Sequence, residues 1–181
     1  MSRAIRIALG ACLVVALAGC ESDTHQTDSG GVLLRVTDFD GLPSVVSVTG
    51  AGGLITIETL TLTNISANPA NPTSELQSIE VRQVEVTFRR RDTGQRLPPP
   101  FVETVSLFVP AGSTADVGNM PFMRSAQLGN LPLSDLANFG VDRETGSAVI
   151  LMDVTLRFFG RTVGGRDVAS SPFTFTVEFR P

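Results

Sequence analysis

The chain has 181 residues, a formal net charge of −4 and 14 basic residues, all of them arginine. This acidic balance argues against nucleic acid as a partner, because binding to phosphates needs a positive surface. Tryptophan and tyrosine are absent, which weakens a carbohydrate-binding role that relies on flat aromatic platforms.

The first nineteen residues have the pattern of an export signal. Arg3 and Arg6 precede an uncharged run from Ile7 to Ala18, which corresponds to the charged and apolar regions of a signal peptide. The run is too short to cross a bilayer as a helix, for which about 20 apolar residues are needed. We therefore expect residues 1–19 to be removed, which leaves twelve arginines against eighteen acids.

A cysteine stands directly after the apolar run. The residues Leu17-Ala18-Gly19-Cys20 resemble the lipobox of bacterial lipoprotein precursors. The resemblance implies cleavage before Cys20, a thioether-linked diacylglycerol on its sulfur, and commonly an N-linked acyl chain such as palmitate. Two or more acyl chains hold a protein stably on a membrane. The alternative is an ordinary signal peptide cut near Ala18, with Cys20 left as a free thiol.

The same resemblance implies a location. A lipoprotein of this kind is expected in the bacterial cell envelope, facing the periplasm, with the membrane as its partner through the acyl chains on Cys20. Glu21 in place of an aspartate favours the outer membrane over the inner one.

A polar segment separates Cys20 from the first hydrophobic run. The eleven residues 21–31 contain no aliphatic side chain, so residues 20–31 are predicted to form a lipidated cysteine and a flexible tether with an r.m.s. span of ~18 Å. Cys12 lies in the discarded signal, and residues 32–181 therefore contain no cysteine for a disulfide. The stability of this single domain must come from its hydrophobic core.

Residues 32–181 are expected to form an all-β domain. Short runs rich in Val, Ile, Leu, Thr and Phe alternate with Gly, Pro, Asn and Asp, a pattern typical of a β-sandwich or barrel. Because strands and helices do not alternate along the chain, a parallel α/β fold is disfavoured. The predicted fold class is a single antiparallel immunoglobulin-like β-sandwich with one short crossover helix. The predicted strands are Val32–Thr37, Ser44–Val48, Leu54–Thr63, Ser78–Arg90, Val102–Val109, Ser113–Val117, Met120–Ser125, Ala148–Arg161 and Val168–Arg180.

Local signals predict the irregular features of this fold. The apolar parity changes once in each of two strands, which predicts β-bulges near Glu58-Thr59 and Arg82-Gln83. The alternative is a strand covered on both faces. Gly164-Gly165 predicts the tight turn of a hairpin. The crossover helix is predicted at Leu133–Phe139, with Gly140 ending it.

The stretch VTLRFFGRTVGGRDV and an arginine-rich loop also resemble uncharacterised bacterial lipoproteins with an immunoglobulin-like sandwich. That resemblance implies a fold and no particular activity.

The sequence offers little material for catalysis. The single histidine, His25, lies in the predicted tether, where nothing orients it as a base or as a metal ligand. Asp38, Asp40 and Gly41 form a fragment of a calcium-binding loop without its further ligands, and a turn with Asp side chains bonded to backbone amides is favoured. We expect no catalytic residue, no metal and no cofactor, although a carboxylate pair assembled by the fold stays open.

Arg89, Arg90 and Arg91, with Arg96 nearby, form the strongest cluster of one charge in the sequence. Guanidinium groups bind phosphates and carboxylates, so this segment is a candidate interaction loop. The alternative is a solvated end of a hairpin, whose charges keep a sheet edge from pairing.

These features predict a membrane-anchored envelope lipoprotein that acts as a non-enzymatic structural or protein-interaction module, with an envelope protein as its candidate partner. The alternative is a carrier of a small ligand or lipid, in which phenylalanines line a cavity between the sheets. An enzyme is the third alternative.

Overall fold

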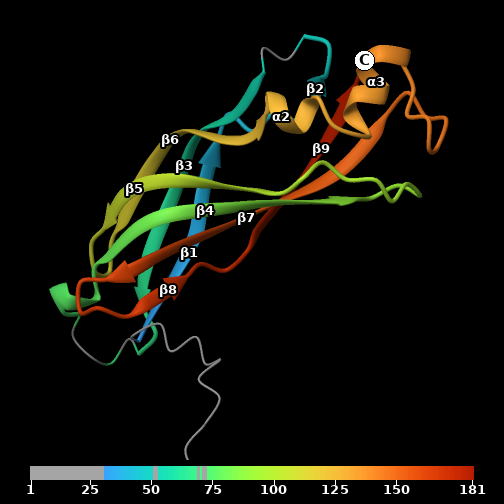
Figure 1. Ribbon diagram of the computed structural model, residues 1–181. Helices are drawn as coiled ribbons and strands as arrows, with labels where there is room; N and C mark the ends of the chain where they lie inside the picture. The colour runs from blue at the N-terminus through green and yellow to red at the C-terminus, as the bar shows by residue number, and fades with distance from the viewer. Residues whose placement is uncertain (1–30, 51–52, 69, 71–72) are drawn as a thin grey trace, which may run out of the picture.

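The computed structural model describes residues 31–50, 53–68, 70 and 73–181, and these form two β-sheets packed face to face (Figure 1). One sheet has the strand order β1-β3-β6, and the other has the order β2-β9-β7-β4-β5 with β8 paired to β7. The predicted all-β sandwich is confirmed.

The elements have the following bounds. The first sheet consists of β1 (Val32–Asp40), β3 (Leu54–Ser66) and β6 (Thr114–Arg124). The second sheet consists of β2 (Val45–Ser47), β4 (Ile79–Arg90), β5 (Phe101–Val109), β7 (Ile150–Thr162), β8 (Asp167–Ala169) and β9 (Phe173–Arg180). The helical segments are η1 (Glu75–Gln77), α2 (Ser125–Leu128) and α3 (Leu133–Phe139).

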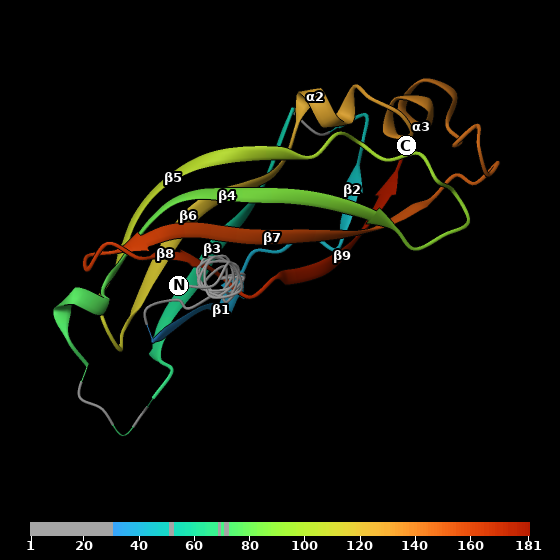
Figure 2. The same ribbon diagram turned by 60° about the horizontal axis from the view of Figure 1, so that its bottom comes forward.

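The order of the strands is immunoglobulin-like. β3 lies beside β6 in one sheet, as strands B and E do in immunoglobulin sandwiches. β4, β7 and β9 are neighbours in the other sheet, as strands C, F and G are. Figure 2 shows β5, β4 and β7 running side by side. We predicted a fully antiparallel sandwich, and this is wrong at one edge, because β2 pairs with β9 in parallel. The chain crosses from β1 in one sheet to β2 in the other without reversing its direction.

Two predicted strand boundaries and the number of helices need correction. The last predicted strand is divided into β8 and β9, because Ser170 turns its side chain back to the Phe158 N–H and Pro172 has no N–H to donate. The two segments predicted on either side of Asn119 form the single strand β6, in which Asn119 has a φ of 50°. Helix α3 has its predicted bounds, whereas α2 is additional to the single crossover helix that we expected.

The predicted bulge at Arg82-Gln83 is confirmed. The register of β4 shifts between Val81 and Gln83 against both of its neighbours. At Glu58-Thr59 the buried face of β3 changes parity as expected, but the pairing of β3 with its neighbours has no register shift there. The shifts lie elsewhere, and the unpaired extra residue is Thr37 in β1 and Phe122 in β6. The bulge prediction at that site is therefore wrong in its position.

The space between the sheets holds a hydrophobic core. Phenylalanine contributes five buried side chains to it, and Phe122 meets Phe175 edge to face with ring centroids 5.2 Å apart. Each large apolar side chain stabilises the fold by about 1.5–3 kcal/mol when fully buried. The buried phenylalanines are Phe88, Phe122, Phe158, Phe175 and Phe179.

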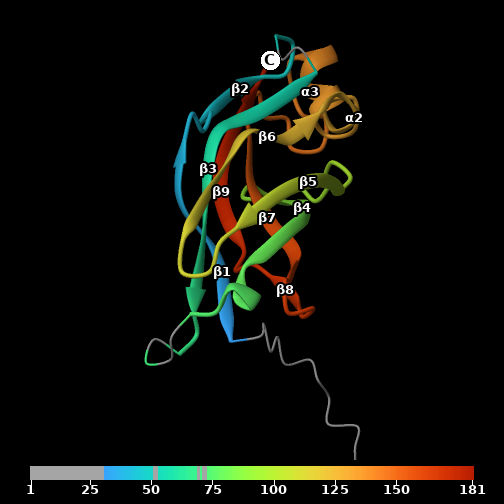
Figure 3. The same ribbon diagram turned by 90° about the vertical axis from the view of Figure 1, so that its left-hand side faces the viewer.

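The elongated sandwich has two ends of different character (Figures 1 and 3). The proximal end carries Gly31, from which the described chain starts, together with η1, the turn 110–113 and the β7–β8 hairpin. At this end the Ala67 N–H, after β3, donates to the Gly31 carbonyl, and the Gly164 N–H donates to the Leu76 carbonyl, which joins the β7–β8 hairpin to η1. The distal end carries the loop 91–100, α2, α3 and the loop 140–149.

The predicted signal peptide, Cys20 and all but the last residue of the predicted tether lie outside the described residues. Among the residues that the structure does describe, no helix has the length and apolar character needed to cross a membrane.

Candidate interaction site

Arg90, the last residue of β4, points into the distal end of the sandwich. It continues the inward-facing series of Val84, Val86 and Phe88, because alternate residues of a strand share one face. Its side chain is only 2% exposed. We expected a residue available to a partner, and the structure corrects this for Arg90, since the parity of the strand buries it.

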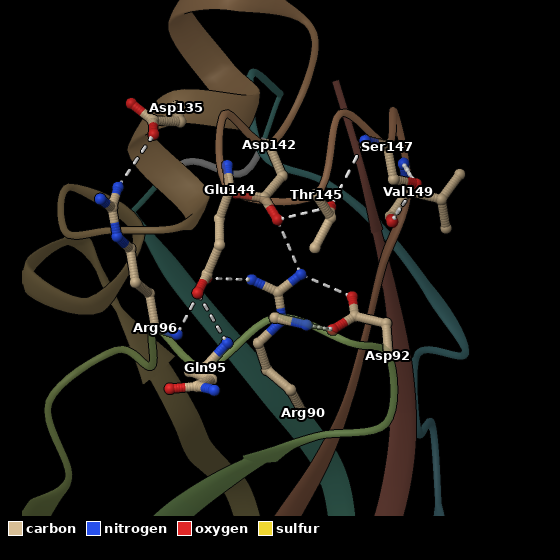
Figure 4. Close-up of polar contacts among 11 residues, drawn as sticks. Arg90, Asp92, Gln95, Arg96, Asp135, Asp142, Glu144, Thr145, Ser147 and Val149 are labelled. Carbon is tan, nitrogen blue, oxygen red and sulfur yellow. Dashed lines mark hydrogen bonds and ion pairs between the residues drawn. The ribbon is translucent and has the colours of Figure 1, made fainter.

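Three carboxylates surround the Arg90 guanidinium (Figure 4). Asp92 accepts a hydrogen bond from Nε over 2.5 Å, and the fully buried Asp142 accepts one from an Nη atom over 2.8 Å. Glu144 lies 3.5 Å from the other Nη atom. A buried guanidinium is tolerated because its charge is paired and its N–H groups are hydrogen-bonded.

The loop between α3 and β7 presents Asp142 in this position. Helix α3 ends at Gly140, whose φ of 73° is readily adopted only by glycine. The Asp142 backbone then closes a turn with Gly146, and its carboxylate accepts hydrogen bonds from the Glu144 N–H and the Thr145 hydroxyl. Contacts within its own turn therefore help to fix the orientation of the Asp142 carboxylate that faces Arg90.

Glu144 ties the arginine-rich loop to the same turn. Its carboxylate accepts hydrogen bonds of 3.0 Å from the backbone N–H groups of Gln95 and Arg96. Gln127 of α2 also donates its side-chain amide to the Pro99 carbonyl. The loop 91–100 is thus held at several points along its length.

These contacts favour the ionised carboxylates. Burial opposes the charge of Asp142, but hydrogen bonds from Arg90, Thr145 and the Glu144 N–H outweigh it and hold its pKa below the ordinary 3.8. For Asp92, burial is likewise outweighed by the Arg90 and Gly94 hydrogen bonds, so its pKa is lowered. The Arg96 and Gln95 N–H groups lower the pKa of Glu144.

Gly94 covers the Arg90 guanidinium closely. A Cβ atom on Gly94 would lie 2.2 Å from Arg90 Cζ and 2.4 Å from one Nη atom. Only a residue without a side chain lets the loop backbone approach the buried cation so closely, which explains the glycine at this position.

The other three arginines of the predicted loop are exposed and also paired. Arg89, with 79% of its side chain exposed, contacts Asp153 over 2.8 Å, while Arg91 lies 3.7 Å from the same carboxylate and donates to the Thr176 hydroxyl. Arg96 lies 3.8 Å from Asp135 of α3. The cluster of one charge in the sequence is therefore charge-balanced in space, which disfavours a simple phosphate site.

Exposed apolar side chains lie among these charges at the distal end. Phe139 is exposed at the end of α3, and the guanidinium of Arg143 stacks over its ring with Cζ 5.0 Å from the centroid. Leu97 on the arginine-rich loop and Leu131 before α3 are exposed as well. Arginine and aromatic side chains dominate the energetics of protein interfaces, so this surface suits a protein partner.

Two other sequence signals have structural explanations. The predicted turn at Asp38 and Asp40 is wrong, because both residues lie in β1 and pair with β3. Their carboxylates do accept hydrogen bonds from backbone N–H groups, those of Phe39 and Gly41. Within the described part of the chain, no group of three or more histidine, cysteine or acidic side chains is arranged to hold a metal ion. His25 lies outside the described residues.

No protein-family model, curated protein or solved structure matches the chain.

Proposed function

We propose that this protein is a non-enzymatic interaction module of the bacterial cell envelope, anchored by acyl chains on Cys20, which presents its distal end to a protein partner. The observation that carries the proposal is the placement of two features at opposite ends of the sandwich. The chain that follows Cys20 joins the domain at Gly31, at the proximal end, and the braced arginine-rich loop lies at the distal end.

The bracing of the loop supports an interaction role. Binding costs less when the contact surface is already ordered, because each side chain or loop segment that is immobilised on association lowers the affinity. Arg90, Asp142 and Glu144 order the loop before any partner arrives. Arg96 and Leu97 then lie exposed on a fixed backbone.

The composition of the distal end favours a protein over a phosphate-bearing ligand. Five carboxylates pair with the four arginines of the segment 89–96, so the surface lacks the positive surplus that phosphates need. The described residues that pair with them are Asp92, Asp135, Asp142, Glu144 and Asp153. A protein surface that offers both apolar and mixed polar groups matches this end better.

The carrier alternative gains less support. A carrier needs phenylalanines around an open cavity, whereas five of the eleven are buried in the core and Phe122 and Phe175 pack on each other. Native mass spectrometry of the domain without its lipid anchor tests this alternative, since a carrier retains an apolar ligand during purification.

Photo-crosslinking in intact cells tests the proposal. Amine-reactive crosslinkers are unsuitable because the chain has no lysine, so a photoreactive residue is placed at Leu97 on the loop. A matched control carries it at Phe39, which is similarly exposed on β1. We expect one envelope protein to be captured from Leu97 and not from Phe39. Capture to equal extents from both positions contradicts the proposal.

The same experiment in a Cys20→Ala protein, exported to the same compartment, separates the anchor from the contact. Loss of the specific capture with retained folding supports presentation at the membrane. Unchanged capture contradicts the need for the anchor.

A further inference from the structure

A patch of exposed apolar side chains lies at the proximal end of the sandwich. It consists of Leu76 in η1, Phe108 near the end of β5, Pro110 in the following turn and Val163 in the β7–β8 hairpin. Leu76 is 61% exposed, and Phe108 and Val163 are each 54% exposed. We call these four residues the proximal patch.

Contacts between the segments bring the residues of the patch close together. Phe108, Pro110 and Val163 line one surface hollow of about 510 Å³, together with polar residues of the η1 segment. The Gly164 N–H, next to Val163, donates to the Leu76 carbonyl over 2.8 Å. Segments that are distant in sequence thus lie together at one tip of the molecule (Figures 1 and 3), and their apolar side chains are exposed.

The position of Gly31 determines what this tip can meet. Gly31 lies at the same end, and a Cβ on it would be 3.7 Å from the side-chain amide of Gln77 in η1. Only the eleven residues 21–31 connect Cys20 to β1, and even fully extended they span at most about 40 Å. An acyl anchor on Cys20 therefore keeps the proximal end near the bilayer surface.

The charges around the patch balance. Glu75 and Asp167 are exposed acids of η1 and β8, and Arg161 and Arg166 are exposed arginines of the hairpin. The turn 110–113 that borders the patch has no charged residue. The exposed apolar residues of this tip can enter the boundary between headgroups and acyl chains, where binding strength grows with the apolar area that is buried.

We propose that the proximal patch rests on the lipid surface of the membrane that anchors the protein, with Leu76, Phe108 and Val163 at the level of the headgroups. This inference rests on the proposed lipid anchor. Because the tether keeps the local concentration of lipid high, a patch with weak affinity of its own is sufficient. Seating on the patch fixes the orientation of the domain, and it turns the arginine-rich loop away from the bilayer.

Fluorescence quenching on vesicles tests the inference with the full lipidated chain. The folded domain has no cysteine, so Val163→Cys supplies a single site for an environment-sensitive fluorophore, and Phe139→Cys supplies a matched site at the distal end. The labelled proteins are reconstituted in vesicles of phosphatidylethanolamine and phosphatidylglycerol that contain a spin-labelled quencher lipid. We expect a blue-shifted emission and at least several-fold stronger quenching for the probe at Val163. Equal quenching at the two positions overturns the inference.

A charged variant gives an independent readout. Leu76→Glu in the Val163→Cys protein should abolish the excess quenching while circular dichroism stays unchanged, because Leu76 is exposed. The matched change Leu131→Glu at the distal end should leave the quenching as it was. Excess quenching that survives Leu76→Glu contradicts the role of the patch.

The intact mass of each protein separates failure of the inference from failure of the anchor. An acylated protein that sediments with vesicles, yet shows equal quenching at both sites, overturns only the inference. A protein without acyl mass overturns the anchor and the inference with it. Capture of a protein instead of lipid by a photoreactive residue at Val163 in intact cells identifies the patch as a protein interface and also overturns the inference.

Discussion

The guanidinium of Arg90 donates a 2.8 Å hydrogen bond to the carboxylate of Asp142, and both side chains are buried. The pair links the end of β4 to the turn before β7, two segments 52 residues apart in the chain. The arginine-rich loop starts directly after Arg90, so this link fixes the point at which the loop leaves the sandwich.

Replacement of Arg90 should destabilise the protein strongly. In Arg90→Met, Asp142 stays buried without its cation, and breaking a buried pair by removing one partner costs about 3–5 kcal/mol in the free energy of unfolding. Chemical denaturation of the two proteins measures the difference. Arg89→Met is the matched control, because Arg89 is exposed and its buried partner Asp153 keeps Arg91 and the Thr176 hydroxyl, so the loss should be only about 0–1 kcal/mol. Equal losses in the two variants contradict the structural role of Arg90.

Gly94→Ala should loosen the loop without removing any charge. Its Cβ would lie 2.2 Å from Arg90 Cζ, and overpacking of this kind costs roughly 1–3 kcal/mol. In the Gly50→Ala control, the nearest atom is the Ser47 hydroxyl oxygen 3.6 Å away, so the change should stay within about 0.5 kcal/mol. Differential scanning calorimetry compares the two. A neutral effect at Gly94 shows that the guanidinium moves aside freely.

Acid should destabilise the protein through the carboxylates at Arg90. The pKa values of Asp92, Asp142 and Glu144 are lowered in the folded state, so these groups stabilise it above their ordinary values of 3.8 and 4.5. The unfolded chain takes up protons first as the pH falls, and the free energy of unfolding must then decrease. We expect it to start falling near pH 4.5 and to keep falling through 3.8 and below.

The acid dependence should be shallower in Arg90→Met, because the variant lacks the guanidinium hydrogen bonds that lower the pKa values of Asp92 and Asp142. Urea denaturation at a series of pH values below 5 measures both slopes. Identical slopes in the two proteins show that other carboxylates cause the acid sensitivity.

Gly160→Ala should disturb the sheet at the bulge of β4. A Cβ on Gly160 would lie 2.4 Å from the Glu80 carbonyl oxygen and 2.9 Å from Val81 Cα, and backbone atoms in a central pair of strands have little room to move. We expect a loss of about 3 kcal/mol in unfolding free energy, the upper part of the range for overpacking. Gly118→Ala, whose nearest contact is 3.9 Å away, should be nearly neutral. Thermal unfolding of both proteins checks the contrast.

The sequence predicts those features that depend on neighbouring residues. Helix α3 has its predicted bounds because Gly140 ends it locally, and the bulge at Arg82 is visible as a change of parity within one strand. The parallel pairing of β2 with β9 could not be predicted in this way. It depends on how the chain crosses between sheets, and no local pattern records that crossing.

The candidate interaction site was predictable only in part. In β4 every second residue up to Phe88 faces the core, and the next residue in this alternation is Arg90, so the sequence pattern indicates that Arg90 is buried. Its partners Asp142 and Glu144 carry no such signal, because only the fold brings the turn before β7 to the end of β4. Charges that are adjacent in the sequence thus looked like a free cationic cluster.

Fractionation of cells, with mass spectrometry of the intact protein, shows whether the domain is held on a membrane by acyl chains on Cys20. We expect the mature chain to start at Cys20, to carry the mass of its acyl chains and to be found with the membranes, and we expect Cys20→Ala to release a folded protein into the soluble fraction. A mature chain without acyl mass, or a Cys20→Ala protein that stays on the membrane, would contradict the proposed anchor.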